Sequence, residues 1–402
     1  MEVAEASYTD NPKGVISGSQ SWEKACLTIL GASTTGPMYT VMYMSGWLKQ
    51  HQGNSIVLEL FITFYPLALG ILLLQVCFDH IIDEILGRWT CNMLRFGVTS
   101  IMNALLLPLI YMYANDTMSL WVIFALMGFS HGVALGSSFE LCLHMPRRCK
   151  GIEYLNVGLQ VGGVATGIFG VLSGFTLQEH PQSYHFYGFA LLTSMLCLSG
   201  FGAVMLLHFY SDIYAKVMKI QPEPPPASLW EVLELLYTLR VCIAATLLTS
   251  GATLLCNGFY TYAPTSRKIN PMDNSVLVVL LVYVNLCSDL IGRTVTTYFG
   301  CPSGMSLLKL VLGRQVLVVV FFIYISQQKF LQDIFILIVL HILMVSHGMF
   351  TTWSFVHANS LATVKGLQRA FVSKMCVIIL FIAILFGSLL GNAVERIWFI
   401  SI

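Results

Sequence analysis

Long apolar stretches alternate with short polar ones along almost the whole chain of 402 residues. A run of about 20 apolar residues can cross the hydrocarbon core of a bilayer as a helix, which satisfies its backbone hydrogen bonds within one segment. The sequence therefore predicts an all-α polytopic membrane protein with eleven transmembrane helices. The predicted spans are 25–48, 55–79, 96–113, 118–143, 152–176, 186–210, 236–262, 275–298, 305–326, 332–357 and 370–394.

The composition supports a membrane protein and argues against several other classes. Hydrophobic residues make up 56% of the chain and charged residues only 10%, with a mean hydropathy of +0.75, whereas a soluble domain carries about 25% charged residues. The net charge of +1 gives no reason to expect a nucleic-acid partner. The 11 cysteines show no disulfide or metal-ligand spacing, so we expect no metal, no cofactor and no enzymatic activity.

The basic residues predict how the chain is oriented. Most of the 21 lie in segments on the same side of the membrane as the N-terminus, and cytoplasmic loops carry such an excess. We therefore expect the N-terminus to be cytoplasmic and, after eleven spans, the C-terminus to be extracellular, in the plasma membrane. The polar start of the chain lacks the apolar core of a cleavable signal peptide. The sequon Asn115-Asp116-Thr117 falls in a loop that this orientation places outside.

The longest inner connection contains the run QPEPPPAS, in which consecutive prolines forbid a helix and favour an extended spacer. It separates six spans from five. A short motif repeats across this division: Glu84-x-x-Gly87-Arg88 follows the second span, and Asp289-x-x-Gly292-Arg293 lies in the eighth. Two related bundles with the substrate between them are the major facilitator arrangement. The predicted parts are a cytoplasmic N-terminal segment 1–24, a six-helix bundle 25–210, a linker 211–235 and a five-helix bundle 236–402.

An acid and a base lie inside the apolar run of the eighth span. Asp289 and Arg293 are four residues apart, so a helix places them on one face, with Asn285 one turn earlier on the same face. Each charge alone would cost about 2.5–3.5 kcal/mol at the centre of a membrane helix, so such residues usually face each other or a polar cavity. The pair is therefore the default functional site. A structural clamp between helices is the alternative, and a gate could use the same residues for both purposes.

Glycines in the fifth span recur at four-residue steps, such as Gly158/Gly162 and Gly163/Gly167, which allow another helix to approach closely. The fourth span carries glycines at the same step. We expect these two spans to form a tight hairpin. Gln160 differs from its glycine neighbours, because an amide in mid-membrane needs a partner from another helix or a ligand.

The first span contains Pro37, which removes a backbone hydrogen bond and predicts a kink there. Met38 and Met42 follow the kink. Thioether side chains suit the face of a planar ligand, although ordinary helix packing explains Met38 equally well.

Several motifs together resemble those of the equilibrative nucleoside transporters. Asp289-x-x-Gly-Arg293 in an eighth span, with Asn285 nearby, looks like the most recognisable motif of that family. The eleven spans and the long connection after the sixth also agree, so the resemblance covers nearly the whole chain. Other similar features are Ser346-His347-Gly348-Met349-Phe350 in span ten, Arg314 in span nine, Pro146 before the glycine-rich fifth span, and the spacing of Gly31, Pro37 and Met42 in the first.

The chain departs from that family at Met38 and Tyr39, where the family usually has Trp-Asn, and its Gln160 is shifted by one position. It is therefore similar to a divergent member, such as one from a protozoan parasite. These positions are among those that line the family's pocket, so the departures bear on substrate preference.

The resemblance implies a facilitative carrier of nucleosides or nucleobases that works by alternating access. The substrate would be held between the two bundles. We expect a monomer whose partners are the lipid bilayer and this small molecule. By resemblance, Asp289 and Arg293 would meet the ribose hydroxyls, Gln160 the base edge, and Met38 and Met42 the base face.

Two other functions remain open at this stage. A major facilitator carrier of sugars or other small nutrients would share the predicted fold, whereas a signalling receptor is disfavoured by eleven spans and a charged pair deep in the membrane. Proton coupling is also open, because His131, Glu140 and His347 lie in or near spans.

Overall fold

The computed structural model describes residues 19–52, 56–146, 149–176, 181–219, 226, 228–257, 259, 274–326, 333–365 and 369–398. These residues form twelve helices, of which eleven are 22 to 34 residues long and one, α7, has 7. The helices are α1 (Ser19–Gln52), α2 (Ile56–Leu86), α3 (Arg88–Met112), α4 (Thr117–His144), α5 (Gly151–Leu172), α6 (Ser183–Tyr210), α7 (Asp212–Met218), α8 (Leu229–Asn257), α9 (Asn274–Thr296), α10 (Gly304–Ser326), α11 (Asp333–Lys365) and α12 (Arg369–Trp398).

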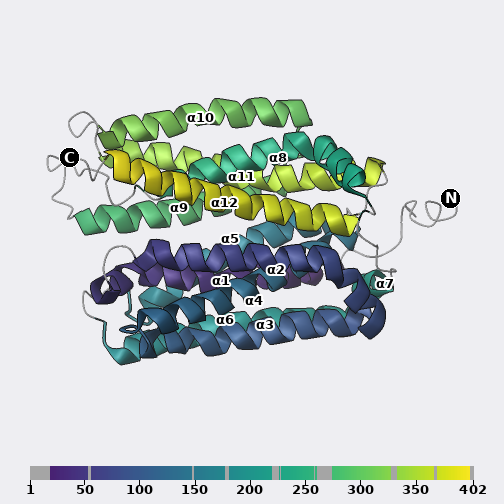
Figure 1. Ribbon diagram of the computed structural model, residues 1–402, viewed down its shortest axis with the longest axis horizontal. Coiled ribbons are helices and arrows are strands. Elements are labelled where there is room, and N and C mark those ends of the chain that lie inside the picture. The colour runs from purple at the N-terminus through teal and green to yellow at the C-terminus, as the bar shows by residue number, and fades with distance from the viewer. Residues whose placement is uncertain are drawn as a thin grey trace.

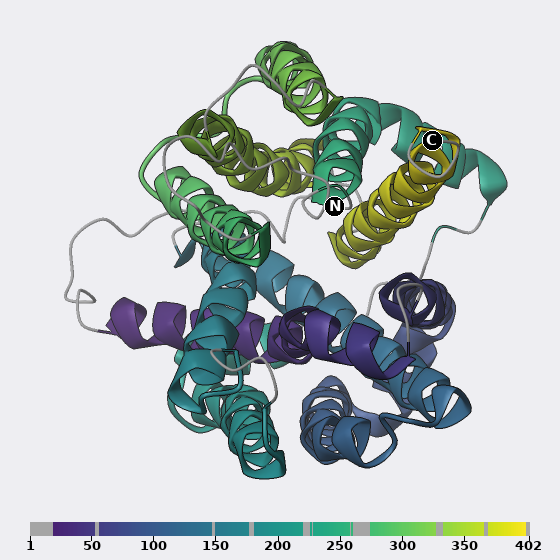
Figure 2. The same ribbon diagram turned by 90° about the vertical axis from the view of Figure 1, so that its left-hand side faces the viewer.

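The long helices fall into two groups that lie one beside the other (Figure 1). Helices α1 to α6 form one group, here called the N-bundle, and α8 to α12 form the other, the C-bundle. The short helix α7 lies at one end of the molecule, in the connection between them. Figure 2 shows the same two groups viewed from the end of the molecule that lies opposite α7. The predicted all-α architecture of six long helices followed by five is therefore confirmed.

Nine helices in the described part of the chain have the length and apolar composition of a membrane span. The other two long helices are α1 and α9, which hold most of the residues predicted to bind substrate. Both lie where the bundles meet: the rings of Tyr43 on α1 and Tyr283 on α9 are 6.1 Å apart. A polar side chain at such a place faces protein rather than lipid. The chain is an integral multi-pass membrane protein.

Helix α5 packs against α1, and glycine permits the approach. A side chain at Gly158 would collide with the backbone carbonyl of Thr28, and one at Gly31 with the backbone of Leu155. Helix α1 continues unbroken through Pro37 along this contact.

The fourth and fifth spans follow each other closely in the chain, but the prediction that they pack tightly through their glycines is wrong. Gly128 and Gly132 of α4 lie against the backbone of α2, at Phe64 and Ala68. Gly158 and Gly162 of α5 face α1, and Gly163 and Gly167 face both α1 and α9. A glycine stripe shows that another helix comes close, but it does not specify which one.

Replacing Gly158 with leucine is expected to prevent the approach of α1 and α5, because the new side chain would overlap backbone atoms. Overpacking of this kind costs about 1–3 kcal/mol or more. Gly202→Leu is the matched control, since no atom lies within 4 Å of a Cβ at Gly202. Size-exclusion chromatography should show a large loss of monodisperse protein for Gly158→Leu alone. Equal elution profiles for the two variants would contradict the contact.

The two bundles share an apolar core along α12. The ring of Phe381 on α12 lies 6.0 Å from that of Tyr65 on α2 and 5.6 Å from that of His131 on α4. Phe355 of α11 stacks on Phe139 of α4 at 4.7 Å. The bundles therefore meet through α12 and α11 on one side, and through α9 and α5 on the other, where Gln160 of α5 donates a hydrogen bond to the carbonyl of Leu286 on α9.

Candidate functional site

Asp289 and Arg293 form the predicted ion pair on one face of α9. The distance from Arg293 Nη2 to Asp289 Oδ2 is 3.1 Å, and Arg293 Nε lies 3.2 Å from both carboxylate oxygens. Both residues are buried, with exposed fractions of 4% for Asp289 and 8% for Arg293. A bidentate arrangement of this kind is among the strongest that a guanidinium makes.

The guanidinium also reaches the other bundle. Arg293 Nη1 donates to Asn156 Oδ1 on α5 at 3.0 Å. Sequence reasoning missed Asn156, which is 1% exposed. The available signal was its position: it lies four residues before Gln160, on the same face of a glycine-rich helix. The Arg293 side chain is therefore bonded to both bundles: to Asp289 on its own helix and to Asn156 on the other side of the interface.

Gln160 makes a second connection between α5 and α9. Its Nε2 donates to the carbonyl of Leu286 at 3.2 Å, and its Oε1 accepts from the hydroxyl of Tyr39 on α1 at 2.7 Å. The amide therefore has the helix partners that its position in the membrane requires. Gln160 and the Asp289–Arg293 pair lie along the same α5–α9 contact.

The other predicted site residues are spread more widely. The sulfur of Met38 accepts from the hydroxyl of Tyr65 on α2 at 3.4 Å. Met42 lies one turn further along α1 and is half-buried. Asn285 turns toward α8, where its Nδ2 is 3.5 Å from Asn257 Oδ1. The structure thus brings Asp289, Arg293 and Gln160 together along the contact between α5 and α9. It places Met38 beside Tyr65. Asn285 points away from this contact, toward α8.

Helix α11 packs directly against α9 at the Asp289–Arg293 pair. A side chain at Gly348 would collide with the backbone and carboxylate of Asp289, so glycine permits α11 to lie directly against α9. The preceding residue, His347, shares a 3.1 Å hydrogen bond with Thr253 of α8. Thr253 in turn accepts from Arg314 of α10 at 2.6 Å. The Ser346-His347-Gly348 motif and Arg314 therefore belong to one polar network inside the C-bundle.

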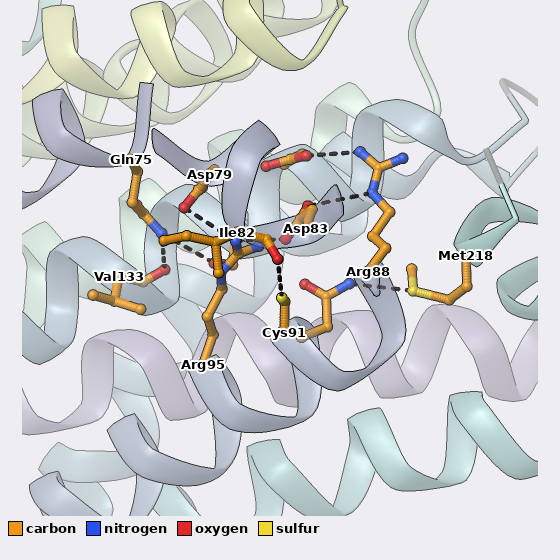
Figure 3. Close-up of polar contacts among 12 residues, drawn as sticks. Gln75, Asp79, Ile82, Asp83, Arg88, Cys91, Arg95, Val133 and Met218 are labelled. Carbon is orange, nitrogen blue, oxygen red and sulfur yellow. Dashed lines mark hydrogen bonds and ion pairs between the residues drawn. The ribbon is translucent and has the colours of Figure 1, made fainter. Parts of the chain in front are cut away.

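A second cluster of buried charges joins α2, α3 and α4 near the α7 end of the molecule (Figure 3). Arg95 lies 3.0 Å from Asp79 and 2.7 Å from Asp83, and Arg88 lies 2.7 Å from Glu140. The glycine before Arg88 has φ 82°, a conformation that favours glycine at the turn from α2 to α3. We call the residues Asp79, Asp83, Arg88, Arg95, Glu140 and Lys374 the charge cluster.

Lys374 completes the charge cluster from the other bundle. Its Nζ on α12 lies 2.7 Å from Asp79 and 3.0 Å from Glu140, and the residue is 4% exposed. Three acidic and three basic residues make the cluster electrically neutral among the residues described. The predicted orientation places Lys374 on the inner side with most of the other basic residues, and nothing in the sequence predicts its burial. The repeated acid-x-x-Gly-Arg motif is not structurally equivalent, because Glu84 is exposed whereas Asp289 is buried.

No protein-family model matches the sequence, and no curated protein matches it. Solved structures do. The chain is similar to the proton:xylose symporter XylE of the major facilitator superfamily, with a TM-score of 0.61 and 12% identity over 95% of this chain and 90% of that one. It is also similar to a bacterial homologue of the iron transporter ferroportin in an outward-facing state, with a TM-score of 0.59 and 11% identity over 93% and 92%. The chain therefore has a major facilitator fold.

Proposed function

We propose that this protein is a facilitative carrier of nucleosides, and of nucleobases, that works by alternating access of the N-bundle and the C-bundle. One observation carries the proposal: a buried, charge-neutral Asp289–Arg293 pair lies where the bundles meet and is bonded to both. Major facilitator carriers hold their substrates between two such bundles. An intramembrane ion pair at this place marks a substrate pathway by default.

The chemistry of the site suits a neutral substrate with a flat apolar part and a polar part. Asp289 can accept hydrogen bonds from ribose hydroxyls and Arg293 can donate them. Gln160 would offer its amide to the edge of a base in place of its present partners, the carbonyl of Leu286 and the hydroxyl of Tyr39. Met38, together with the aromatic ring of Tyr65, supplies the apolar contact that a base face requires. A mostly apolar pocket with a few fixed polar groups is the usual design for such ligands.

Alternating access requires that contacts between the N-bundle and the C-bundle break at one end of their interface while the other end is closed. At the end that holds α7, Lys374 of α12 binds Asp79 and Glu140 of the N-bundle. At the same end the Nζ of Lys150, just before α5, donates to the carbonyl of Thr297, just after α9. The described structure is therefore closed at this end, which the distribution of basic residues predicts to be cytoplasmic. Opening toward the cytoplasm would break both contacts.

A sugar carrier is the second candidate, and the similarity to a xylose symporter favours it. Free sugars and ribose both present hydroxyls to Asp289 and Arg293, but only a nucleoside also needs the apolar contact at Met38. We therefore expect a substrate with a base to be preferred.

Competition for uptake distinguishes the two substrates. Uptake of labelled adenosine into cells that express the protein should fall severalfold with excess inosine, uridine or adenine, and should not change with xylose or glucose. Adenosine uptake equal to that of cells lacking the protein, together with saturable xylose uptake, would favour the sugar carrier instead.

A further inference from the structure

Asn156 is oriented by its own helix toward Arg293. Its Nδ2 donates to the carbonyl of Ile152, one turn earlier in α5, at 2.9 Å. This bond fixes the amide so that Oδ1 is presented as an acceptor, and Arg293 Nη1 donates to it at 3.0 Å. The same Nη1 lies 3.4 Å from the backbone carbonyl of Asn156. Asn156 therefore presents two oriented acceptors, its Oδ1 and its backbone carbonyl, to one side of the guanidinium.

The donors of Arg293 are divided between the two bundles. Its Nε and Nη2 bind Asp289, which is on the same helix and moves with it. Its Nη1 binds Asn156, which is on the other bundle. When the bundles separate, Arg293 keeps Asp289 and loses Asn156. Asn156 is thus the bonded neighbour of Arg293 that changes during alternation.

In the described part of the chain, the bond lies between two other polar connections that join α5 and α9 or the residues next to their ends. Lys150 meets Thr297 at the α7 end, and Gln160 meets Leu286 one turn beyond Asn156. These connections run in order along both helices, in opposite directions, so separation at the α7 end must break the Lys150 contact and then the Asn156 contact. The Asn156 bond therefore lies between the predicted cytoplasmic end and Gln160.

We propose that Asn156 is a positioning residue that holds Arg293 across the interface while the α7 end is closed, and thereby sets how readily that end opens. The proposal rests on the alternation of the two bundles described above, and it does not depend on which substrate is carried. The proposal assigns a transport role to a residue that does not contact the substrate and acts only on the position of Arg293.

Two substitutions should shift the equilibrium in opposite directions. Asn156→Leu preserves the size of the side chain but removes the acceptor, so the α7 end should open more readily. Asn156→Asp gives up the donor to the carbonyl of Ile152 but places a carboxylate against Arg293 Nη1, and charge-assisted hydrogen bonds are roughly twice as strong as neutral ones. The closed form should then be favoured. A merely structural role would make both variants less stable without this opposite effect.

Labelling of Cys149 measures the opening without any substrate. Cys149 is 3% exposed and precedes Lys150, so it should become accessible when the α7 end separates. In inside-out vesicles, a thiol reagent should modify Cys149 about tenfold faster in Asn156→Leu than in the wild type, and more slowly in Asn156→Asp. Peptide mapping, with Cys149→Ser as the blank, assigns the signal to this residue.

Gln315→Leu is the matched control. It removes amide hydrogen bonds to the carbonyls of Leu248 and Val311, both inside the C-bundle, so labelling of Cys149 should stay at the wild-type rate. Unchanged labelling in Asn156→Leu, or a shift in the same direction for both Asn156 variants, would overturn the proposal. Opposite shifts together with an absence of nucleoside uptake would leave it standing and refute the proposed substrate.

Discussion

Replacing Arg293 with alanine is expected to abolish uptake and to reduce the amount of folded protein. The change leaves Asp289 as an uncompensated carboxylate that is only 4% exposed, and breaking a buried pair in this way costs about 3–5 kcal/mol. Asp289→Asn should behave differently. Asparagine keeps the size of the side chain and still accepts from Arg293, whose Nη1 retains Asn156. We expect the variant still to reach the surface, in a smaller amount than the wild type because Arg293 loses its counter-charge, with uptake reduced more than about tenfold because the proposed charged contact with the sugar is lost.

The double variant Asp289→Asn/Arg293→Gln separates a substrate site from a structural clamp. No orphan charge remains, so the folded amount should recover relative to Arg293→Ala. Uptake should not recover, since neither of the charged partners that we propose for the ribose is present. Initial uptake rates, divided by the amount of protein at the cell surface, give the comparison. A double variant with near-native rates would mean that the pair serves packing alone.

Replacing Lys374 with methionine is expected to destabilise the protein by a similar amount. Methionine fills much of the same volume, but Asp79 and Glu140 lose a cation at 2.7 and 3.0 Å, and the charge cluster acquires a net negative charge. The expected cost is again about 3–5 kcal/mol, as for any buried pair broken by removing one partner. The apparent melting temperature in detergent should fall by several degrees.

Two further variants test the explanation. Lys309→Met makes the same change at an exposed lysine of α10 and should leave the melting temperature unaltered. Lys374→Met/Glu140→Gln restores neutrality, with Asp79 and Asp83 facing Arg88 and Arg95, and should recover part of the lost stability. If Lys374→Met melts at the wild-type temperature, Lys374 does not tie the bundles together.

The helices could be predicted because the membrane imposes one structural solution on each apolar run. The run 275–298 corresponds to α9 (Asn274–Thr296), and 305–326 to α10 (Gly304–Ser326). The ends were less accurate. The run 25–48 corresponds to α1 (Ser19–Gln52), because the first turns of this helix carry polar residues that are covered by protein, such as Glu23, which accepts a hydrogen bond from Ser211.

The Asp289–Arg293 pair was predictable for a local reason: helical geometry alone brings residues four apart together. Contacts between helices distant in sequence were not. Nothing in the sequence specifies that α5 meets α1, that Asn156 reaches Arg293, or that Lys374 enters a cluster built by α2, α3 and α4. Asn156 and Lys374 are single residues that form no repeating pattern along their helices. Their partners lie on helices distant in sequence and can be identified only from the assembled bundles.

Counterflow in liposomes that contain the purified protein tests the central claim most directly. Labelled adenosine outside should accumulate transiently in liposomes preloaded with unlabelled adenosine or uridine, because the unlabelled substrate inside competes with the label for the inward-facing site of the carrier and so slows its exit. Preloading with xylose should give no accumulation, and the Asp289→Asn/Arg293→Gln variant should give none with any substrate. Accumulation after preloading with xylose, or none after preloading with any nucleoside, would contradict a nucleoside carrier that uses this pair.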